Sequence, residues 1–430
     1  MVVLSKLYSE SLQKMCCNEI IHSRGCTDNL IHQIPKYIQS NMKYFAVLTL
    51  LPLLLKINKL NRKIVKDTLT YYANTVFSGF QLAVFINILI CAFRRRPELF
   101  GRYNIMFLPV FISGLAIHFF WVAPRVKQLF GASILQVTID SVCLRRENVI
   151  TRAIANSKGV RTLIFMFCSA IILHAKQKKL CKTFWIVTPN EQPIKESSPE
   201  IENSNIQIFE NENNNIPNSL CNHKTSCRAH VLTGLRNYLT IGLSLDTIKM
   251  VMSRIPKDVP YNTFISKLWA KLKNYQFNTT ALLAASVGIY RLVNCHLNHL
   301  YPLKKYLTIN HLVASFLCGS AYVFLPKLSL LSYGLVICIE LFWEQFKRKN
   351  YKELPKNIAE NNIVKFVNKS TLGLLLFPPA VAYLVHTYVY RKHFVSALGE
   401  EIINGLTHGY GKQISFNISR AEQLMEAALK

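Results

Sequence analysis

Long runs of apolar residues constrain the fold of this chain more than any other feature of its sequence. The run FQLAVFINILICAF ends at Phe93 and is followed at once by three arginines, Arg94 to Arg96. A helix needs about 20 apolar residues to cross a bilayer unaided, and basic residues beside such a stretch anchor it at the lipid headgroups. Charged residues make up 17% of the chain, against about 25% in a typical soluble protein. The sequence therefore predicts an all-α, polytopic membrane protein.

The charge of the chain is strongly basic, with 51 Lys and Arg against 23 Asp and Glu. Proteins that bind nucleic acid concentrate such a surplus on a soluble polar face. Here the basic residues flank the apolar runs instead, as membrane anchors do. We therefore expect membrane lipids as partners, and no nucleic acid.

The apolar runs differ in length, and not all of them are long enough to span a bilayer. Residues 43–55 and 235–252 are short for a span, and the second segment carries Asp246 and Lys249, so we expect amphipathic or half-inserted helices there. Pro378 and Pro379 should kink the last span, because proline lacks a backbone donor. The predicted spans are 68–93, 104–122, 129–144 (which is marginal), 160–175, 277–297, 308–325, 328–344 and 370–390.

The two halves of the chain resemble each other in the order of their features. His22-x3-Cys26 recurs 201 residues later as His223-x3-Cys227, and Asp140 lies opposite Glu340 at an offset of 200. The sequence therefore predicts two tandem repeats of about four transmembrane helices, each preceded by a Cys/His knot and an amphipathic helix.

These observations predict six segments. Residues 183–220 are rich in Asn, Glu, Ser and Pro, a composition that cannot bury enough apolar surface to order itself, so we expect a disordered acidic linker there. The predicted segments are 1–66 (knot and amphipathic helix of repeat 1), 67–182 (its membrane bundle), 183–220 (linker), 221–260 (knot and amphipathic helix of repeat 2), 261–395 (its membrane bundle) and 396–430 (C-terminal tail).

The two Cys/His knots offer three good zinc ligands each. A zinc site usually takes four, and Cys16 and His230 are nearby candidates for the missing ligand. Structural zinc is one interpretation; redox-sensitive thiols and simple local packing are the others. Cysteines inside the apolar runs, such as Cys91 and Cys295, are interpreted as small hydrophobic residues. The candidate metal ligands are Cys17, His22, Cys26, Cys221, His223 and Cys227.

Three charged residues lie inside or near the predicted spans: Asp140, Glu340 and Arg291. A carboxylate at bilayer depth costs at least about 2.5 kcal/mol and usually faces a bundle interior or a polar cavity. One interpretation is that these side chains line a polar path or hold the two halves together. The alternative is that both carboxylates, being near helix ends, reach the headgroups.

The sequence contains none of the motifs G-x-S-x-G or H-E-x-x-H, nor a phosphate-binding glycine loop, so we expect no enzymatic activity. His296, His299 and His311 lie around a span boundary and are interpreted as interfacial. Ala284-x3-Gly288 is a small-xxx-small pattern that lets helices approach closely in lipid. An assembly of several copies is compatible with such a pattern.

The second half carries a resemblance to a known family. Cys221, His223 and Cys227, the following GLRNYLTIGLSLDTIKMVMSRIP, and the runs NYQFNTTALLAASVGIYRLVNCHL and LLSYGLVICIELFWE resemble the transmembrane protein 135 family. The resemblance covers most of the chain and is strongest from Cys221 to about Tyr390. The second half is also distantly similar to the Tim17-type four-helix membrane domain.

The resemblance implies a multi-pass protein of the mitochondrial or peroxisomal membrane. Members of the family are associated with the balance of mitochondrial fission and fusion, with peroxisome organisation and with lipid metabolism. A non-enzymatic regulator acting on the fission machinery, with a dynamin-related GTPase as its soluble partner, is therefore the first functional hypothesis. The alternative is a transporter or a lipid or solute conduit.

Overall fold

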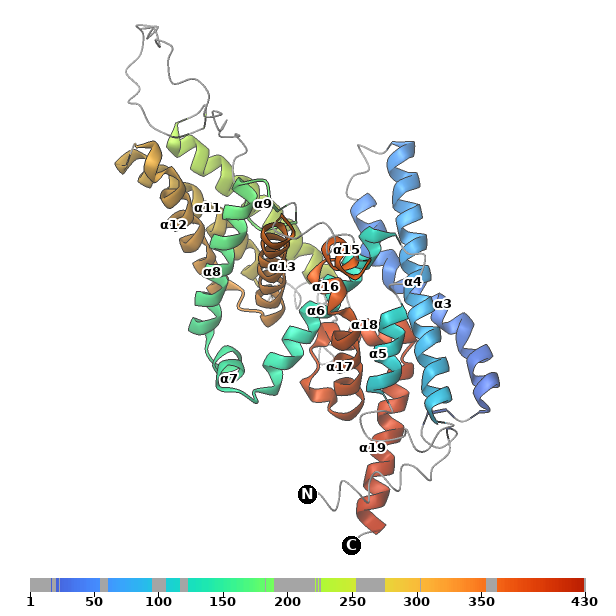
Figure 1. The fold of residues 1–430 in the computed structure, drawn as a ribbon. Helices are drawn as coiled ribbons and strands as arrows, with labels where there is room; N and C mark the ends of the chain where they lie inside the picture. Colours follow the sequence, from blue (N-terminus) through green and yellow to red (C-terminus); the bar gives the residue numbers. More distant parts are fainter. Residues whose placement is uncertain are drawn as a thin grey trace, which may run out of the picture. The chain divides into compact units, whose positions relative to one another are not determined.

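The structure is a computed structural model, and the residues that it describes form helices and no β-strand (Figure 1). The all-α prediction is therefore confirmed for this part of the chain. The residues described are 17, 21–22, 24–54, 61–94, 106–116, 123–181, 183–188, 221, 223, 226–252, 275–301, 303–352 and 362–428. The N-terminal residues 1–16 and most of the predicted acidic linker, 189–220, lie outside them.

The chain forms two compact units. Unit 1 comprises Met1–Asn156 and Phe342–Lys430, and unit 2 comprises Ser157–Leu341. α13 (Leu328–Lys352) begins in unit 2 and ends in unit 1. The other helices of unit 1 are α3 (Cys26–Leu54), α4 (Arg62–Arg94), α5 (Phe107–Ala116), α6 (Pro124–Arg145), α7 (Val149–Asn156), α15 (Asn362–Lys369), α16 (Leu372–Leu375), α17 (Phe377–Tyr390), η5 (Lys392–Phe394), α18 (Ala397–Thr407) and α19 (Tyr410–Ala428). Those of unit 2 are α8 (Lys158–Gln177), α9 (Cys227–Met252), α11 (Asn278–Leu300), η3 (Lys304–Tyr306), α12 (Leu307–Cys318) and η4 (Gly319–Phe324).

Five helical segments are long and apolar enough to cross a membrane, which supports the predicted multi-pass character. They are Arg62–Arg94, Lys158–Gln177, Asn278–Leu300, Leu307–Phe324 and Leu328–Asn350. The predicted span 104–122 is represented by the short apolar helix α5, and its last residues lie outside the described part of the chain. α6, which covers the marginal run 129–144, is not among the five.

The predicted last span, 370–390, is not one continuous helix. α16 ends at Leu375 and α17 begins at Phe377, with a proline in its first two positions. Proline is tolerated there because the first N–H groups of a helix have no intrahelical partner. The run is therefore interrupted directly before Pro378 and Pro379, where the sequence predicted a kink, and the two prolines lie in the first turn of α17.

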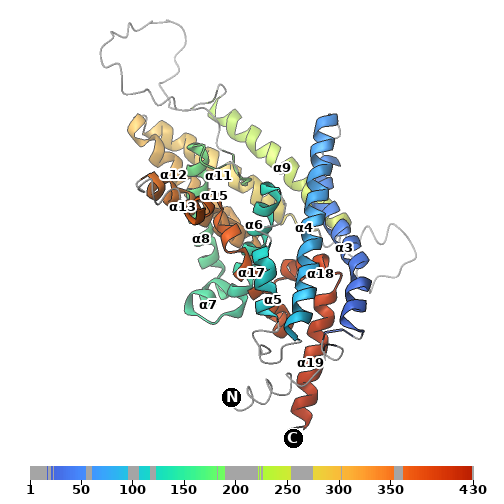
Figure 2. The same ribbon diagram turned by 45° about the vertical axis from the view of Figure 1, so that its right-hand side comes forward.

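The two predicted amphipathic helices are longer than the sequence suggested. The segment 43–55 is largely the end of α3, which has 29 residues, and 235–252 is the end of α9, which has 26. In unit 1, α3 packs along α4, and in unit 2, α9 packs along α11 (Figures 1 and 2). Each of these helices begins at a cysteine of a Cys/His knot, Cys26 and Cys227. The knots are thus the N-terminal ends of long helices.

The core of unit 1 contains helices that are far apart in sequence. α17 packs against α5 and α6, so that Phe130, Phe377 and Tyr388 share one buried cluster. α3 crosses α4 closely: a Cβ atom added to Gly79 would overlap the side-chain oxygen of Asn41. Unit 1 therefore combines helices from the first predicted repeat with the last span of the second.

Unit 2, in turn, combines helices of the second predicted repeat with the last span of the first. α8, the last span of the first predicted repeat, packs against α12 and η4. Phe165 of α8 stacks on Tyr322 with ring centroids 4.6 Å apart, and on Trp185 at 5.3 Å. Trp185 is 2% exposed, and the Tyr333 hydroxyl donates to the carbonyl of Phe184 at 2.9 Å. Residues 183–188, predicted as the start of the disordered linker, are therefore packed into unit 2.

Candidate metal centres

The first Cys/His knot lies against the end of α4. The carbonyl of Cys17 accepts hydrogen bonds from the backbone N–H groups of Ile21 and His22, at 2.8 and 3.0 Å, and this tight turn brings His22 back toward Cys17. Cys26 begins α3, and Cys91 reaches the same place from the last turns of α4. The ligand atoms of the four residues Cys17, His22, Cys26 and Cys91 all lie within 4.8 Å of one another.

The second knot has the same arrangement in unit 2. Cys221, His223 and Cys227 precede or begin α9, and Cys295 comes from the neighbouring α11. Their ligand atoms also lie within 4.8 Å of one another. His223 Nε2 is 3.5 Å from Cys227 Sγ and 3.3 Å from Cys295 Sγ, and the sulfurs of Cys221 and Cys227 are 3.8 Å apart. No disulfide joins any of the cysteines that the structure describes.

These separations match the edges of a zinc tetrahedron. Zinc bonds thiolate sulfur at about 2.3 Å and imidazole nitrogen at about 2.0 Å, which places two sulfurs about 3.8 Å apart and a sulfur and a nitrogen about 3.5 Å apart. The first centre has the same edge, because His22 Nε2 is 3.5 Å from Cys91 Sγ. An iron–sulfur cluster distributes its ligands over several irons, so ligand sets this compact fit a single ion. The three-cysteine, one-histidine donor set is one that structural zinc uses.

The fourth ligands differ from those that the sequence suggested. His230 is outside the second cluster: its ring stacks on that of His223 with centroids 4.5 Å apart. Burial lowers the pKa of His230 to about 4, and the nearby charges of Arg291 and His223 act in the same direction. Cys16 lies outside the described residues. Each fourth ligand comes instead from the next long helix.

Cys91 and Cys295 are therefore ligand candidates, although the sequence analysis interpreted them as small hydrophobic residues. They are 8% and 7% exposed, as their apolar surroundings in the sequence predicted. One signal could have identified them: they are 204 residues apart (295 − 91), and so are Cys17 and Cys221 (221 − 17). A repeated spacing shared by two cysteine pairs points to a common site.

Burial distinguishes the two histidine ligands. His22 is 2% exposed, whereas His223 is only partly buried. Burial lowers the pKa of His22, which favours the neutral imidazole that binds metal ions. The histidine of the first centre is thus preorganised in the protonation state that ligation requires.

The three predicted intramembrane charges have different surroundings. Asp140 is 1% exposed on α6 of unit 1, whereas Glu340 and Arg291 belong to unit 2. Arg291 Nη1 donates to the carbonyl of His230 at 2.7 Å, and its guanidinium lies against Gly234, so this side chain joins α11 to α9. The idea that these charges line one polar path or join the two halves stays a prediction.

His311, which the sequence analysis interpreted as interfacial, is buried inside the protein. It is 3% exposed within unit 2, where its Nδ1 lies 2.8 Å from the Tyr290 hydroxyl and its Nε2 lies 3.4 Å from Ser315 Oγ. His296 and His299 are exposed. The sequence missed this cluster because its members come from α11 and α12 and have no fixed spacing.

Asp246, which the sequence placed at the membrane interface, is 3% exposed in α9. Its Oδ2 accepts hydrogen bonds from the backbone N–H of Thr280 at 2.9 Å and from the Thr280 hydroxyl at 2.8 Å. It therefore caps the start of α11. Burial alone would raise the pKa of Asp246, but hydrogen bonds from Thr279 and Thr280 lower it below its ordinary value.

Both centres join the start of one helix to the end of the next. Comparison with known proteins adds no further identification: no family model, no curated protein and no solved structure matches this chain.

Proposed function

We propose that the protein is a non-enzymatic, multi-pass membrane protein in which each Cys/His centre holds one structural zinc ion. The observation that carries the proposal is the presence of two complete four-ligand sets with tetrahedral edges. In structural zinc sites all four positions are taken by protein ligands, whereas catalytic sites keep one position open for water or substrate. Four protein ligands in each centre favour the structural role.

Each centre would fasten an antiparallel pair of helices at the end opposite its connecting segment. In unit 1, Tyr72 near the start of α4 donates to the carbonyl of Met42 at 2.9 Å, and Asn87 near the end of α4 donates to the Tyr37 hydroxyl at 3.0 Å. Cys91 lies one turn beyond Asn87 and meets the residues that precede α3. A metal ion bound there would link the start of α3 to the end of α4, two helix ends that are distant along the chain.

We also infer that the two units descend from one duplicated unit, as the sequence predicted. Gly79 faces Asn41 at the α3–α4 crossing, and Gly242 faces Thr280 at the α9–α11 crossing. Asn41 and Gly242 are 201 residues apart, and so are Gly79 and Thr280. A close crossing at a glycine therefore occurs in both helix pairs, with the glycine on α4 in unit 1 and on α9 in unit 2. The presence of α17 in unit 1 and α8 in unit 2 agrees with an exchange of the last helix between the repeats.

At the level of the cell, we propose that the protein regulates mitochondrial dynamics and peroxisome organisation or lipid metabolism from an organelle membrane. This proposal is supported by the resemblance of the segment from Cys221 to the transmembrane protein 135 family. A transporter or lipid or solute conduit is the second candidate, because the buried carboxylate of Asp140 is of a kind found along permeation paths. Flux through reconstituted protein that disappears when Glu340 or Asp140 is neutralised would favour the conduit.

The metal proposal is tested by measuring zinc in the purified full-length protein by mass spectrometry. We expect two zinc ions per chain, and one in each of the variants Cys91→Ala and Cys295→Ala. Cys318→Ala is the matched control, because its thiol is 2% exposed but lies outside both centres. A wild-type protein without zinc, or variants that keep both ions, would overturn the proposal. A fluorescently tagged copy, viewed beside mitochondrial and peroxisomal markers, tests the location.

A further inference from the structure

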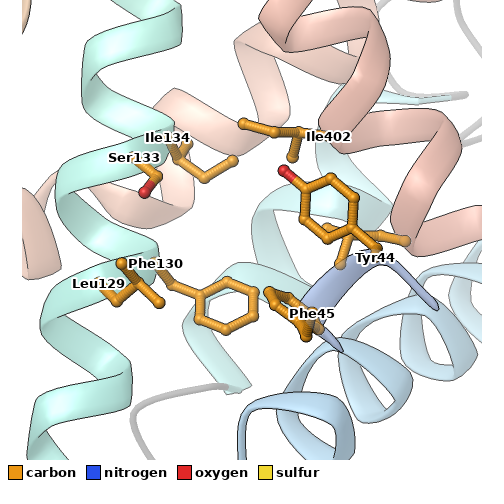
Figure 3. Close-up of a pocket in the computed structure, with 8 residues that line it drawn as sticks. Tyr44, Phe45, Leu129, Phe130, Ser133, Ile134 and Ile402 are labelled. Atoms are coloured by element: carbon orange, nitrogen blue, oxygen red, sulfur yellow. The ribbon is translucent and has the colours of Figure 1, made fainter. Parts of the chain in front are cut away.

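Unit 1 contains a pocket that the metal centres do not involve. It lies between α3, α6 and α18, and Figure 3 shows its side chains converging on a central space. The Phe45 and Phe130 rings form one wall, with centroids 5.6 Å apart. The eight lining residues are Tyr44, Phe45, Leu129, Phe130, Ser133, Ile134, Ile402 and Leu406.

The wall of the pocket between α3 and α18 is fixed by hydrogen bonds and by close contact. Asn41 Nδ2 donates to the carbonyl of Leu406 at 2.9 Å, and Ser40 donates to the carbonyl of Gly405 at 2.7 Å. The Tyr44 ring lies directly on Gly405, where an added Cβ would be 2.5 Å from the ring. The pocket is therefore held open by its own scaffold, as preformed ligand sites are.

The chemistry of the lining selects the occupant. None of the eight lining residues carries a charge, and only Tyr44 and Ser133 have polar side chains. A buried water needs two to four polar partners, so most of this space does not suit water. An unfilled apolar space forfeits the dispersion contacts of its walls. Hydrocarbon is the occupant that satisfies both conditions.

The volume of the pocket and the lipid around the protein indicate which hydrocarbon binds. The space inside the pocket measures about 50 Å³, well below the roughly 300–1,000 Å³ of pockets that enclose a whole ligand. A space of this size takes a segment of one hydrocarbon chain and excludes a whole lipid. Five membrane-spanning candidates place the protein among lipid tails, so hydrocarbon is present at high local concentration. The lack of a lining cation excludes recognition of a phosphate or a free carboxylate inside the pocket.

We propose that this pocket binds a segment of one acyl chain of a membrane phospholipid, inserted between α3, α6 and α18, with the headgroup remaining outside. Tyr44 and Ser133 would offer hydroxyl groups to the ester region or to the start of the chain. Burial raises the pKa of Tyr44 to about 12, and the charge of Glu401 acts in the same direction, so its hydroxyl remains a donor at neutral pH. The site does not depend on the metal centres.

The test uses the full-length protein reconstituted in lipid nanodiscs that contain a phosphatidylcholine with a photoreactive diazirine in one tail. After irradiation, labelled peptides are mapped by mass spectrometry. Ile402 and Leu406 are each 7% exposed, so surrounding lipid does not reach them, and their labelling reports a chain inside the pocket. We expect label on α18 together with label on α3 or α6. Absence of label on α18 in the wild type overturns the proposal.

Three variants sharpen the test. Ser133→Phe fills the pocket and should lower α18 labelling at least fivefold, whereas Val142→Phe adds the same ring on the exposed side of α6 and should leave it unchanged; Val142 is 40% exposed. Ile402→Ala enlarges the pocket and should keep the α6 label, which shows that a change in the lining does not by itself abolish labelling. Equal α18 labelling in Ser133→Phe and wild type overturns the proposal. So does labelling by a free diazirine fatty acid but not by the phospholipid.

Discussion

Replacing Cys295 by alanine removes one ligand of the proposed second zinc centre. Among the described residues it is the only ligand that α11 supplies there. The other three ligands precede or begin α9. Without Cys295, any remaining metal would be bound by residues adjacent in sequence and would no longer connect α9 to α11. We therefore expect the variant to lose the second zinc ion and to be less stable in unit 2.

The size of the effect follows from the loop that the metal closes. Cys227 and Cys295 enclose roughly 70 residues, and a cross-link over a loop of that length stabilises the folded state by about 4 kcal/mol in the chain-entropy treatment. For a unit of this size each kcal/mol shifts the melting temperature by about 2–4 °C. Losing the link should therefore lower the melting temperature of unit 2 by about 10 °C. Truncating the thiol to a methyl adds a smaller packing cost.

Trp185 provides a local readout of that transition, because it is 2% exposed in unit 2 and stacks on Phe165. Its fluorescence can be followed on heating in a background where the other three tryptophans are replaced by phenylalanine. Cys318→Ala serves as the control for thiol burial and should shift the transition by only a few degrees. Equal shifts in the two variants, with zinc retained in both, would refute the idea that Cys295 connects the helices through a metal ion.

Three further changes test the packing around the centres. Gly242→Ala should lower the free energy of unfolding by about 1–3 kcal/mol, because the new Cβ would lie 2.5 Å from Thr280 Cα. Gly288→Ala is the control and should lower it less, because its Cβ meets only the flexible end of Leu235. Chemical denaturation of the two variants measures the difference. Asp246→Asn should cost about 1 kcal/mol at pH 7 by weakening the cap of α11. The folded-state pKa of Asp246 is lowered, so its contribution to stability is complete above the ordinary value of 3.8 and is lost as the pH falls through the folded-state pKa. The difference in unfolding free energy between wild type and variant should therefore disappear only in acid. Unfolding at several pH values measures this difference. Tyr290→Phe leaves the buried His311 without its hydroxyl partner and should cost about 1–3 kcal/mol, measurable as a lower melting temperature of unit 2.

The sequence predicted the local parts of the metal centres and missed the distant ones. Cys17, His22 and Cys26 fall within ten residues of one another, so their spacing alone suggests a site. Cys91 comes from the next helix, and its neighbours in the sequence do not distinguish it from a cysteine that only packs in an apolar core. Ligands contributed across a helix pair depend on how the helices pair, and a single sequence does not specify that pairing by its pattern.

The helix boundaries show a similar division. Hydropathy identified the spans with long apolar runs, because burial in lipid requires them at any position in the fold. It did not identify α9 as a 26-residue helix, since one side of this helix is built of Gly234, Gly242 and Asp246, which are small or polar residues that meet α11. Hydropathy also did not place Trp185 inside unit 2. Its aromatic partners are Phe165 of α8 and Tyr333 of α13, and neither is close to Trp185 in the sequence.

The proposed duplication separates what the two units share from what differs between them. The four-ligand centres and the close helix crossing occur in both. The interiors differ: His311 of unit 2 hydrogen-bonds within a polar cluster, whereas Val110 of unit 1 is 0% exposed in an apolar core. A feature kept in both copies serves the common scaffold, whereas an interior that has diverged is free to acquire a separate role. We therefore expect loss of either metal centre to act first on stability, and substitutions in the pocket of unit 1 or the His311 cluster of unit 2 to alter function while zinc content stays constant.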